Sequence, residues 1–262
     1  MQCRRLHFHT HPVGIMTRQH IKYDERDGIA EITICRPEKR NAMTAQMFAG
    51  LRDCWDKFVQ GEARVAILKS CDDAVFSAGA DLTEPPEHFW LSVPEFGFRC
   101  DKPIIAALSG KVIGAGLTLA LMCDFIVMTE DSTLIYPEAK VGIAKGAITA
   151  VVRRAPLRVA LEMMVTGDPV SAQRAYETGM VNRIVPEGKH VEEARTLARR
   201  IADNAPLVVE MLKRMSLEAV GDVPIQGYYA TMMHIDQVAD SQDARDALEA
   251  FREKRKPVFR RK

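Results

Sequence analysis

Apolar and polar residues alternate along two short segments near the start of the chain, Ile21–Tyr23 and Ile29–Ile34. A period of two is typical of strands with one buried face, and Asp27-Gly28 between the segments is a turn signal. Pro37 ends the second segment, because proline cannot donate a hydrogen bond to a neighbouring strand. The pattern predicts an opening β-hairpin whose connection is longer than two residues.

The period then changes to that of a helix over residues 45–60, which Asn41 or Thr44 can cap. The apolar face of this predicted helix comprises Met47, Leu51, Trp55 and Phe58. Two apolar runs, residues 65–70 and 103–108, come later and are bounded by polar or turn-forming residues. Their length and composition predict buried strands.

Small residues follow both of these strands. The first set is Phe76-Ser77-Ala78-Gly79-Ala80-Asp81, and the second extends from Ser109-Gly110 to Gly114-Ala115-Gly116. Small residues let a ligand approach the backbone closely, and glycine also allows unusual backbone angles. Two such loops can direct two peptide N–H groups at one oxygen, which is how enzymes stabilise an anion that develops on a carbonyl. The sequence therefore predicts a site built from backbone.

The rest of the chain repeats this scheme once and then becomes helical. A helix over 115–122 and strands over 124–129 and 133–135 complete the repeated unit. Pro85, Pro86 and Pro94 exclude a single regular helix between the two loops. Further helices are predicted, with a break at 181–186, over residues 146–154, 157–165, 171–178, 190–204, 206–220, 225–239 and 241–254. The fold class predicted is α/β, with stacked strand–strand–helix turns in front and helices behind.

Composition is that of an ordinary globular protein. The 262 residues are 47% hydrophobic and 27% charged, which is enough to bury a substantial core. A net charge of +1 gives no reason to expect nucleic acid or a membrane as a partner, and no apolar run reaches the ~18 residues of a spanning helix. The six cysteines include no C-x-x-C pair, which predicts reduced, mostly buried thiols and a cytoplasmic location.

Residues 1–15 do not share these patterns. His7, His9 and His11 occupy alternate positions and in an extended strand can bind a metal ion. The favoured interpretation is a disordered extension outside the fold, without a metal site. The segment lacks the apolar stretch of a secretory signal.

Other motifs occur in a fixed order between Ile21 and Phe259. They are Arg36-Pro37-Glu38-Lys39-Arg40-Asn41-Ala42-Met43, Phe76–Leu82, Gly114–Gly116 leading to Leu119–Asp124, Pro137-Glu138, Leu161–Gly167 with Ser171–Ala175, Gly179–Val181 and Phe251–Phe259. Together they resemble the crotonase superfamily, also called the enoyl-CoA hydratase/isomerase family. The resemblance implies a crotonase-type spiral of strand–strand–helix turns over residues 16–200. It also implies a C-terminal helical region, 201–262, that drives homotrimers, which often pair into hexamers.

The resemblance further implies an acyl-CoA thioester as the ligand, with no cofactor beyond the CoA moiety of the substrate. It places an oxyanion hole at the backbone N–H groups of Ala80 and Ala115. Ala115 stands where many members have the middle glycine of a Gly-Gly-Gly run, and the hole persists if φ is negative there. Other expected binding residues are Ala78, Gly79, Asp81 and Gly114 around the hole, and Lys39, Arg40, Lys254 and Lys256 for the CoA phosphates.

The expected chemistry depends on two positions. Many hydratases of the family use two glutamates, of which the second matches Glu138 and the first falls on Thr118. A single carboxylate can remove a proton at one carbon and return it two carbons away. A threonine is no useful base near neutral pH. The sequence therefore favours double-bond isomerisation of the Δ3 to Δ2 type, with Glu138 as the base.

Several alternatives stay open at this point. Thr118 can hold a water for hydration of a 2-enoyl-CoA, or it can simply bond to an upstream carbonyl within its helix. Glu84 and Glu87 are candidate substitute bases, and a non-catalytic acyl-CoA binder is a further interpretation. A dinucleotide site is weakly indicated, because Leu119 replaces the third glycine of that fingerprint. Serine hydrolysis has no nucleophile motif to support it.

Overall fold

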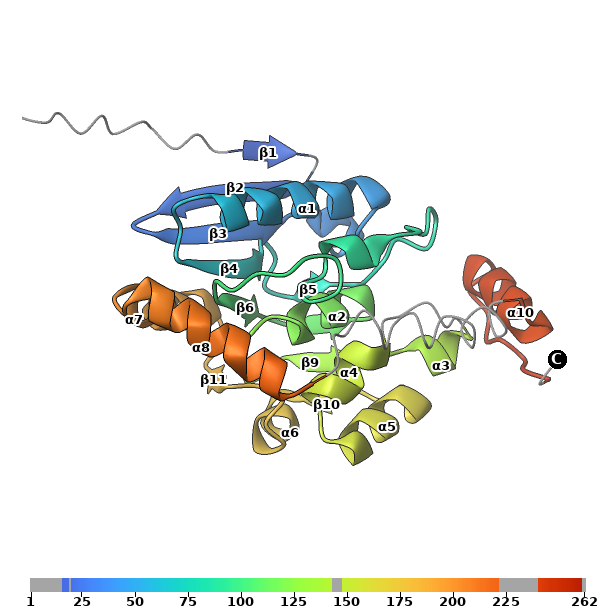
Figure 1. Cartoon of the computed structure of the whole chain (residues 1–262). Helices are drawn as coiled ribbons and strands as arrows, with labels where there is room; N and C mark the ends of the chain where they lie inside the picture. The colour runs from blue at the N-terminus through green and yellow to red at the C-terminus, as the bar shows by residue number, and fades with distance from the viewer. Residues whose placement is uncertain (1–15, 19, 143–147, 222–239, 261–262) are drawn as a thin grey trace, which may run out of the picture.

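The computed structural model describes residues 16–18, 20–142, 148–221 and 240–260. Two sheets form its centre (Figure 1). The larger sheet has the order β1 (Met16–Arg18), β2 (Ile21–Arg26), β3 (Ile29–Ile34), β4 (Val65–Ser70), β6 (Ile104–Leu108), β8 (Phe125–Thr129) and β11 (Arg183–Val185). The smaller sheet has the order β10 (Val170–Ser171), β9 (Thr133–Ile135), β7 (Lys111–Ile113) and β5 (Val75–Ser77).

The two sheets are connected as successive turns of a spiral. Strands β4, β6 and β8 pair in parallel in the larger sheet, and each is followed by a short strand of the smaller sheet, β5, β7 or β9. The predicted stack of strand–strand–helix units, and with it the crotonase-type fold, is confirmed. The strands of the smaller sheet are so short that periodicity alone did not predict β5 and β7, which lie next to the two glycine-containing loops.

Helices surround these sheets. They are α1 (Ala45–Gln60), α2 (Ala115–Leu121), α3 (Glu138–Val141), α4 (Ile148–Arg154), α5 (Leu157–Thr166), α6 (Ala172–Glu177), α7 (His190–Ala202), α8 (Pro206–Ala219) and α10 (Gln242–Arg252), with 3-10 turns η1 (Pro37–Lys39) and η2 (Phe89–Ser92). Most of the predicted helices are confirmed. The helix predicted over 225–239 and the start of that over 146–154 lie outside the described residues, and α3 was not predicted.

Local sequence signals account for the first elements. The hairpin register pairs Ile21 with Ile34 and Arg26 with Ile29. Asp27 and Gly28 both have positive φ, the backbone of a tight two-residue turn, so the prediction of a longer connection was wrong. Thr44 caps α1 by accepting a hydrogen bond from the Met47 N–H. The predicted apolar face of α1 is buried against the sheets.

The larger sheet is covered on both faces. One face packs on the main core, which includes α1. On the other face α7 places Ala194, Ala198 and Ala202 against apolar residues of β3, β4, β6 and β8. Alanine side chains let a helix lie close to a sheet, and double coverage explains why the central strand β6 is buried along its whole length. The buried sheet therefore supports the strands that lead into the 78–81 and 114–116 loops.

The C-terminal helices are less covered. Helix α8 has no buried residue in the single chain, and its exposed apolar side chains are Leu207, Val208, Met211, Leu212 and Met215. Helix α10 instead buries Ala244, Ala247 and Ala250, and it contacts α3 beside it (Figure 1). In the part of the chain that the structure describes, no helix is long and apolar enough to span a membrane.

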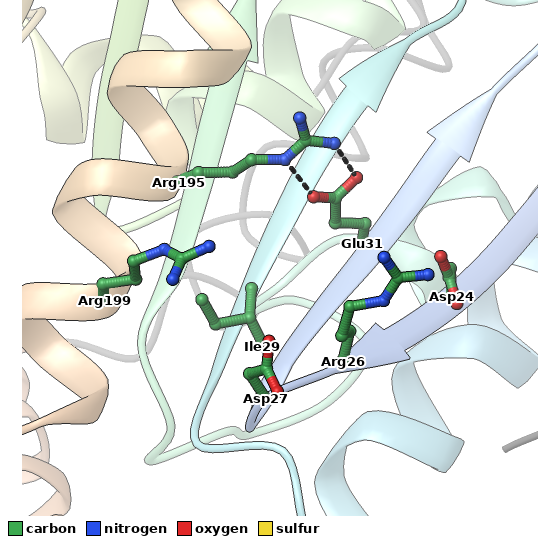
Figure 2. Close-up of a pocket in the computed structure, with 7 residues that line it drawn as sticks. All are labelled: Asp24, Arg26, Asp27, Ile29, Glu31, Arg195 and Arg199. Carbon is green, nitrogen blue, oxygen red and sulfur yellow. Dashed lines mark hydrogen bonds and ion pairs between the residues drawn. The ribbon is translucent and has the colours of Figure 1, made fainter. Parts of the chain in front are cut away.

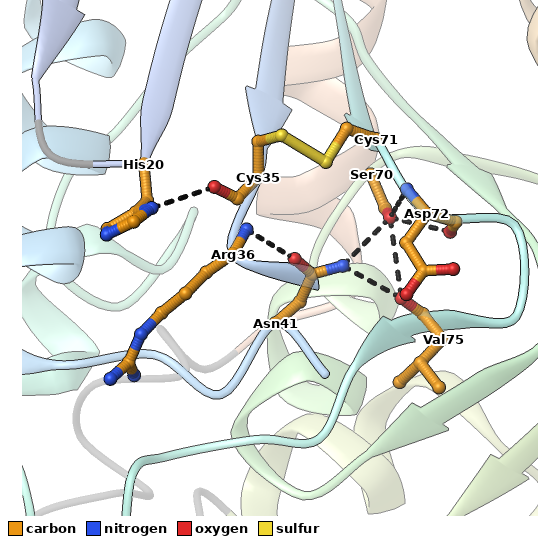
Figure 3. The surroundings of a disulfide bond; sticks show 8 residues. All are labelled: His20, Cys35, Arg36, Asn41, Ser70, Cys71, Asp72 and Val75. Atoms are coloured by element: carbon orange, nitrogen blue, oxygen red, sulfur yellow. Dashed lines mark hydrogen bonds between the residues drawn. A yellow bond between two sulfur atoms is a disulfide. The ribbon is translucent and has the colours of Figure 1, made fainter. Parts of the chain in front are cut away.

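The cysteines differ from the sequence prediction. Cys35 and Cys71 form a disulfide (Figure 3), so these two are not reduced thiols. They follow Ile34 and Ser70, the last pair in the parallel register of β3 and β4. Neighbouring strands thus bring their Cα atoms to 5.1 Å, inside the range that a disulfide can bridge. Cys54, Cys100 and Cys123 form no disulfide and are buried, as predicted, and Cys3 lies outside the described residues.

Candidate functional site

Two loops meet at the ends of paired strands. The 78–81 loop follows β5 and the 114–116 segment follows β7, and these strands are parallel neighbours. The contact is close: a Cβ atom on Gly79 would lie 3.0 Å from the Ile113 carbonyl oxygen and 3.3 Å from the Ala115 nitrogen. Gly79 also has φ of +92°, a conformation that other residues rarely adopt. Glycine at position 79 is what allows the two loops to touch.

The peptide N–H groups of Ala80 and Ala115 are free for a ligand. Ala80 forms a parallel bridge with Met43, in which the flanking Gly79 carbonyl and Asp81 N–H bond to Met43. The N–H of Ala80 itself therefore points to the opposite side. Ala115 is the first residue of α2, so its N–H has no acceptor within the helix. Its helical backbone has negative φ, and the alanine methyl group causes no strain.

An ion pair between Arg36 and Asp81 holds the 78–81 loop. The Arg36 guanidinium donates to Asp81 Oδ2 at 2.8 Å and to the Ala42 carbonyl at 2.8 Å. The Thr83 hydroxyl and N–H donate to Asp81 Oδ1. Burial alone raises the pKa of Asp81, but the hydrogen bonds from Thr83 and Arg36 outweigh it and lower this pKa to about 2. Asp81 is thus an ionised structural group at neutral pH.

Glu138 is the opposite case. It starts α3 directly after Pro137, and its Oε2 is buried without a hydrogen-bond partner. Burial raises the pKa of Glu138 to about 7, although its own N–H partly offsets the effect. A Cβ atom on Gly114 would lie 3.8 Å from Glu138 Oε1, so the carboxyl group borders the 114–116 segment. A carboxyl group that is half ionised near neutral pH can both take and give a proton.

The loops and Glu138 line one cavity of about 430 Å³. Its lining includes the loop residues Ala78, Gly79, Ala80, Asp81, Gly114 and Ala115, together with Arg40 and Glu138. It also includes the apolar residues Leu82, Pro85, Pro86, Phe89, Val141 and Phe251. Volume and composition suit a small organic group with a single reacting end.

Not every predicted residue lies at this cavity. Thr118 is fully buried, its hydroxyl lies 3.4 Å from the Gly114 carbonyl, and it is absent from the cavity lining. Lys39, Lys254, Lys256, Glu84 and Glu87 are all exposed and outside the lining. The described residues also contain no group of three side chains that could hold a metal ion, and His7, His9 and His11 lie outside them.

Sequence reasoning missed three contributors. Arg36 was quoted only as part of a motif, because its pairing with Asp81 joins positions far apart in the chain. Phe89 and Phe251 were not singled out for the pocket. Phe251 reaches the cavity because α10 packs on α3, and a sequence signal for that contact is the alanine spacing of Ala244, Ala247 and Ala250.

A second, smaller cavity of about 280 Å³ lies between the hairpin and α7 (Figure 2). Its main feature is Glu31, which accepts two hydrogen bonds from Arg195, at 2.5 and 2.9 Å, and an ion pair from Lys69 at 2.7 Å. Burial raises the pKa of Glu31, but the bonds from Arg195 and Lys69 outweigh it and lower this pKa to about 2. These charges satisfy each other and attach α7 to the sheet.

Comparison with known proteins places the chain. The family model for enoyl-CoA hydratase/isomerase matches residues 24–262. A carnitinyl-CoA dehydratase of Salmonella typhimurium LT2 is 35% identical over 252 residues, covering 88% of this chain and 95% of that protein.

Two solved structures support the same placement. A carnitinyl-CoA hydratase from Mycobacterium avium is 32% identical, with a TM-score of 0.84 over 94% of this chain and 100% of that one. An enoyl-CoA hydratase from Mycobacterium tuberculosis H37Rv is 34% identical, with a TM-score of 0.71 over 92% of this chain and 98% of that one. The chain belongs to the enoyl-CoA hydratase/isomerase family.

Proposed function

We propose that this member of the enoyl-CoA hydratase/isomerase family is a hydro-lyase, which adds water to a 2-enoyl-CoA or removes it from a 3-hydroxyacyl-CoA. One observation carries the proposal: the Glu138 carboxyl group, whose Oε2 is buried without a hydrogen-bond partner, shares a cavity with the peptide N–H groups of Ala80 and Ala115. Burial raises the pKa of this carboxyl group to about 7. The names of similar proteins, carnitinyl-CoA dehydratase and enoyl-CoA hydratase, support hydration rather than the isomerisation that the sequence favoured.

The two N–H groups provide the electrostatic part of the reaction. When the thioester oxygen lies between the N–H groups of Ala80 and Ala115, electron density that moves onto this oxygen is stabilised by both donors. Donors that are fixed before the reaction need no reorganisation, and the loss of one typically costs about 2.7–4 kcal/mol in the barrier. Gly79 and the Arg36–Asp81 ion pair fix the first donor.

Glu138 can carry the proton in both steps. In the ionised form it takes a proton from water as the water oxygen bonds to Cβ, and the alkene electrons move to the thioester oxygen as an enolate. The enolate then collapses, and Cα takes the same proton from Glu138. Water adds as a whole and the carboxylate is restored, so one group with a pKa near 7 is sufficient. Dehydration runs through these steps in reverse.

This mechanism assigns no role to Thr118. The sequence offered Thr118 as a holder of the water, but its hydroxyl faces the Gly114 carbonyl and not the cavity. The nucleophilic water is therefore held by the carboxylate that activates it. Thr118 matches the simpler interpretation of a helix threonine bonded to an upstream carbonyl.

Isomerisation is the second candidate, and one observation favours it. The described residues that line the cavity include only two carboxylates, Asp81 and Glu138, and Asp81 is engaged by Arg36 and Thr83. A single free carboxylate suits a 1,3-proton shift without water. The substrate itself decides between the two reactions, since both use the same hole and the same base.

The remaining binding roles follow from position. Arg40 lines the cavity and is proposed to face the CoA phosphates, with the exposed Lys39 and Lys254 adding positive charge around it. The CoA moiety of the substrate is the only cofactor proposed. The exposed apolar side chains of α8 support a homotrimer, or a hexamer of paired trimers, in which residues 201–262 contribute the contacts around the 16–200 core.

Product analysis tests the proposed function. The purified protein is incubated separately with a 2-enoyl-CoA and a 3-enoyl-CoA in H₂¹⁸O, and products are identified by mass spectrometry. The proposal expects a 3-hydroxyacyl-CoA that carries ¹⁸O on C3 from the 2-enoyl substrate. Conversion of the 3-enoyl substrate to a 2-enoyl-CoA without any hydroxyacyl product would show the isomerase instead.

A further inference from the structure

The disulfide lies directly behind the loops of the site. Cys35 directly follows β3 and precedes Arg36, and Cys71 directly follows Ser70, the last residue of β4. Figure 3 shows Asn41 between the two strand ends. The Asn41 side chain accepts from the Arg36 N–H at 2.7 Å and donates to Ser70 Oγ at 3.1 Å. The same amide donates to the Val75 carbonyl at 2.9 Å, so one side chain joins the segment after Cys35 to residues on both sides of Cys71.

The same segments hold the 78–81 loop. The Ala78 N–H donates to the Arg40 carbonyl at 2.9 Å, and the Ser77 hydroxyl donates to the Asn41 carbonyl at 2.8 Å. Arg36, the neighbour of Cys35, holds Asp81 through its guanidinium. The donor N–H of Ala80 is thus positioned by a short path that starts at the disulfide, passes through residues 36–43 and ends in the loop.

The disulfide is also accessible, and it differs in this from the other described cysteines. Cys71 is exposed and Cys35 is half-buried, whereas Cys54, Cys100 and Cys123 are buried thiols. Burial raises the pKa of Cys100 to about 11, and it also raises the pKa of Cys123. Thiolate character and access determine exchange reactivity, so redox chemistry is directed to one pair.

We propose that Cys35 and Cys71 form a thiol–disulfide exchange site for a dithiol reductant, and that the oxidised pair holds the 78–81 loop in its thioester-binding geometry. The reductant thiolate attacks the sulfur of Cys71, the more exposed residue of the pair, the disulfide bond breaks, and Cys35 leaves as a thiolate that takes a proton. The second reductant thiol then attacks the mixed disulfide and releases Cys71. Two electrons pass to the protein, and the reductant ends as its own disulfide.

Opening the bond removes a cross-link but leaves the sheet intact, because the strands remain paired through β3 and β4. We expect the reduced protein to stay folded, with more freedom in residues 36–43 and 72–81. Sub-ångström displacement of a donor is costly, since a misplacement of about 1 Å can lower a rate by 10²-fold. The reduced protein should therefore show kcat/KM lower by roughly 3- to 30-fold. Only this second half of the inference rests on the proposed function.

The test follows redox state and function in the same samples. The native protein is equilibrated with buffers of reduced and oxidised dithiothreitol, quenched with an alkylating agent, and the state of residues 35 and 71 is read by mass spectrometry. Turnover of 2-enoyl-CoA and binding of a non-reactive 2-oxoalkyl-CoA thioether, whose carbonyl oxygen can reach the two N–H donors, are measured in parallel. The double variant C35S/C71S imitates the open pair, and C100S is the control because its hydroxyl can keep the bond to the Lys102 carbonyl.

The proposal expects reversible opening, weaker binding and turnover in the open state, the same defect in C35S/C71S without redox response, and a wild-type response in C100S. Failure of the native pair to open under excess dithiol, or to form under oxidant, would overturn the exchange site. Opening without any change in thioether binding would overturn the link to the loop. If no sample turns over acyl-CoA, the proposed function fails, while thioether binding still decides this inference.

Discussion

The two carboxylates of the cavity occupy contrasting environments. Asp81 accepts hydrogen bonds from Arg36 and Thr83 on its two carboxylate oxygens, and its pKa is about 2. Glu138 lies on a helix of one turn, with a buried oxygen that has no partner, and its pKa is about 7. Asp81 holds the 78–81 loop, whereas Glu138 is available for proton transfer.

The contrast teaches that position in the cavity does not determine role. Both groups line the same space, so proximity to a ligand does not separate them. Hydrogen bonds do, because several bonds to the ionised form keep Asp81 charged, whereas burial outweighs the single bond from its own N–H and favours the neutral form of Glu138. Perturbation of the pKa in opposite directions is the pattern expected for one structural and one catalytic acid.

The largest expected effect is on turnover when Glu138 loses its proton-transfer capacity. Glu138→Gln keeps the size of the side chain, so it should lower kcat by about 10²–10⁴-fold and leave CoA binding nearly unchanged. Steady-state kinetics and calorimetric binding of CoA measure the two quantities. Glu84→Gln and Glu87→Gln are matched controls, since both side chains are exposed and outside the cavity lining. A loss below tenfold in E138Q contradicts the assignment.

The second expected effect is a gain in stability from the same substitution. The pKa of Glu138 is about 7 in the folded protein, against an ordinary value of 4.5 for a glutamate, so the folded state binds more protons between these values. Its contribution to stability is present below pH 4.5 and is lost as pH rises through 7, by up to about 3 kcal/mol. E138Q lacks this loss. Urea denaturation at pH 5 and pH 8 should show a smaller decline for E138Q than for wild type, and equal declines would refute the expectation.

Asp81→Asn is expected to lower stability, whereas Glu138→Gln raises it. The substitution leaves Arg36, only 15% exposed in its side chain, with only the more distant Glu38 carboxylate at 3.9 Å, which should cost about 2 kcal/mol of unfolding free energy. The loop should loosen as well, so KM for the acyl-CoA rises. Because the folded-state pKa of Asp81 is low, its contribution to stability is present above the ordinary aspartate value of 3.8 and is lost as pH falls through 2. Unchanged stability and KM at pH 7 would show that the ion pair does not hold the loop.

Thr118→Val is expected to have the smallest effect. Valine has nearly the same shape, and the hydroxyl makes only a long contact of 3.4 Å with the Gly114 carbonyl. Turnover should change less than about threefold, and the unfolding free energy less than about 1 kcal/mol. Initial rates with a 2-enoyl-CoA provide the measurement. A large and selective loss of hydration would mean that Thr118 holds the reacting water.

The sequence predicts features that lie within short motifs better than contacts between residues far apart in the chain. Ala80, Ala115 and Glu138 lie in short motifs whose spacing carries the resemblance, and the cavity contains all three. The Arg36–Asp81 pair and the Cys35–Cys71 disulfide join residues 45 and 36 positions apart. The register of β3 and β4 brings the two cysteines together, and the fold of the 78–81 loop brings Asp81 to Arg36. Thr118 was singled out because it stands where many family hydratases have their first glutamate. Its contact with the Gly114 carbonyl is what distinguishes a helix threonine from a catalytic group.

The most direct test is a measurement of the Glu138 pKa itself. Protein labelled with ¹³C at the glutamate carboxyl carbons is titrated by NMR, and E138Q identifies the resonance by its absence. The account predicts a titration midpoint near 7, well above those of the exposed glutamates. A midpoint near the ordinary value of 4.5 would mean that the Glu138 carboxylate is solvated or paired. The contrast between the two carboxylates, and with it the single-group mechanism, would then be contradicted.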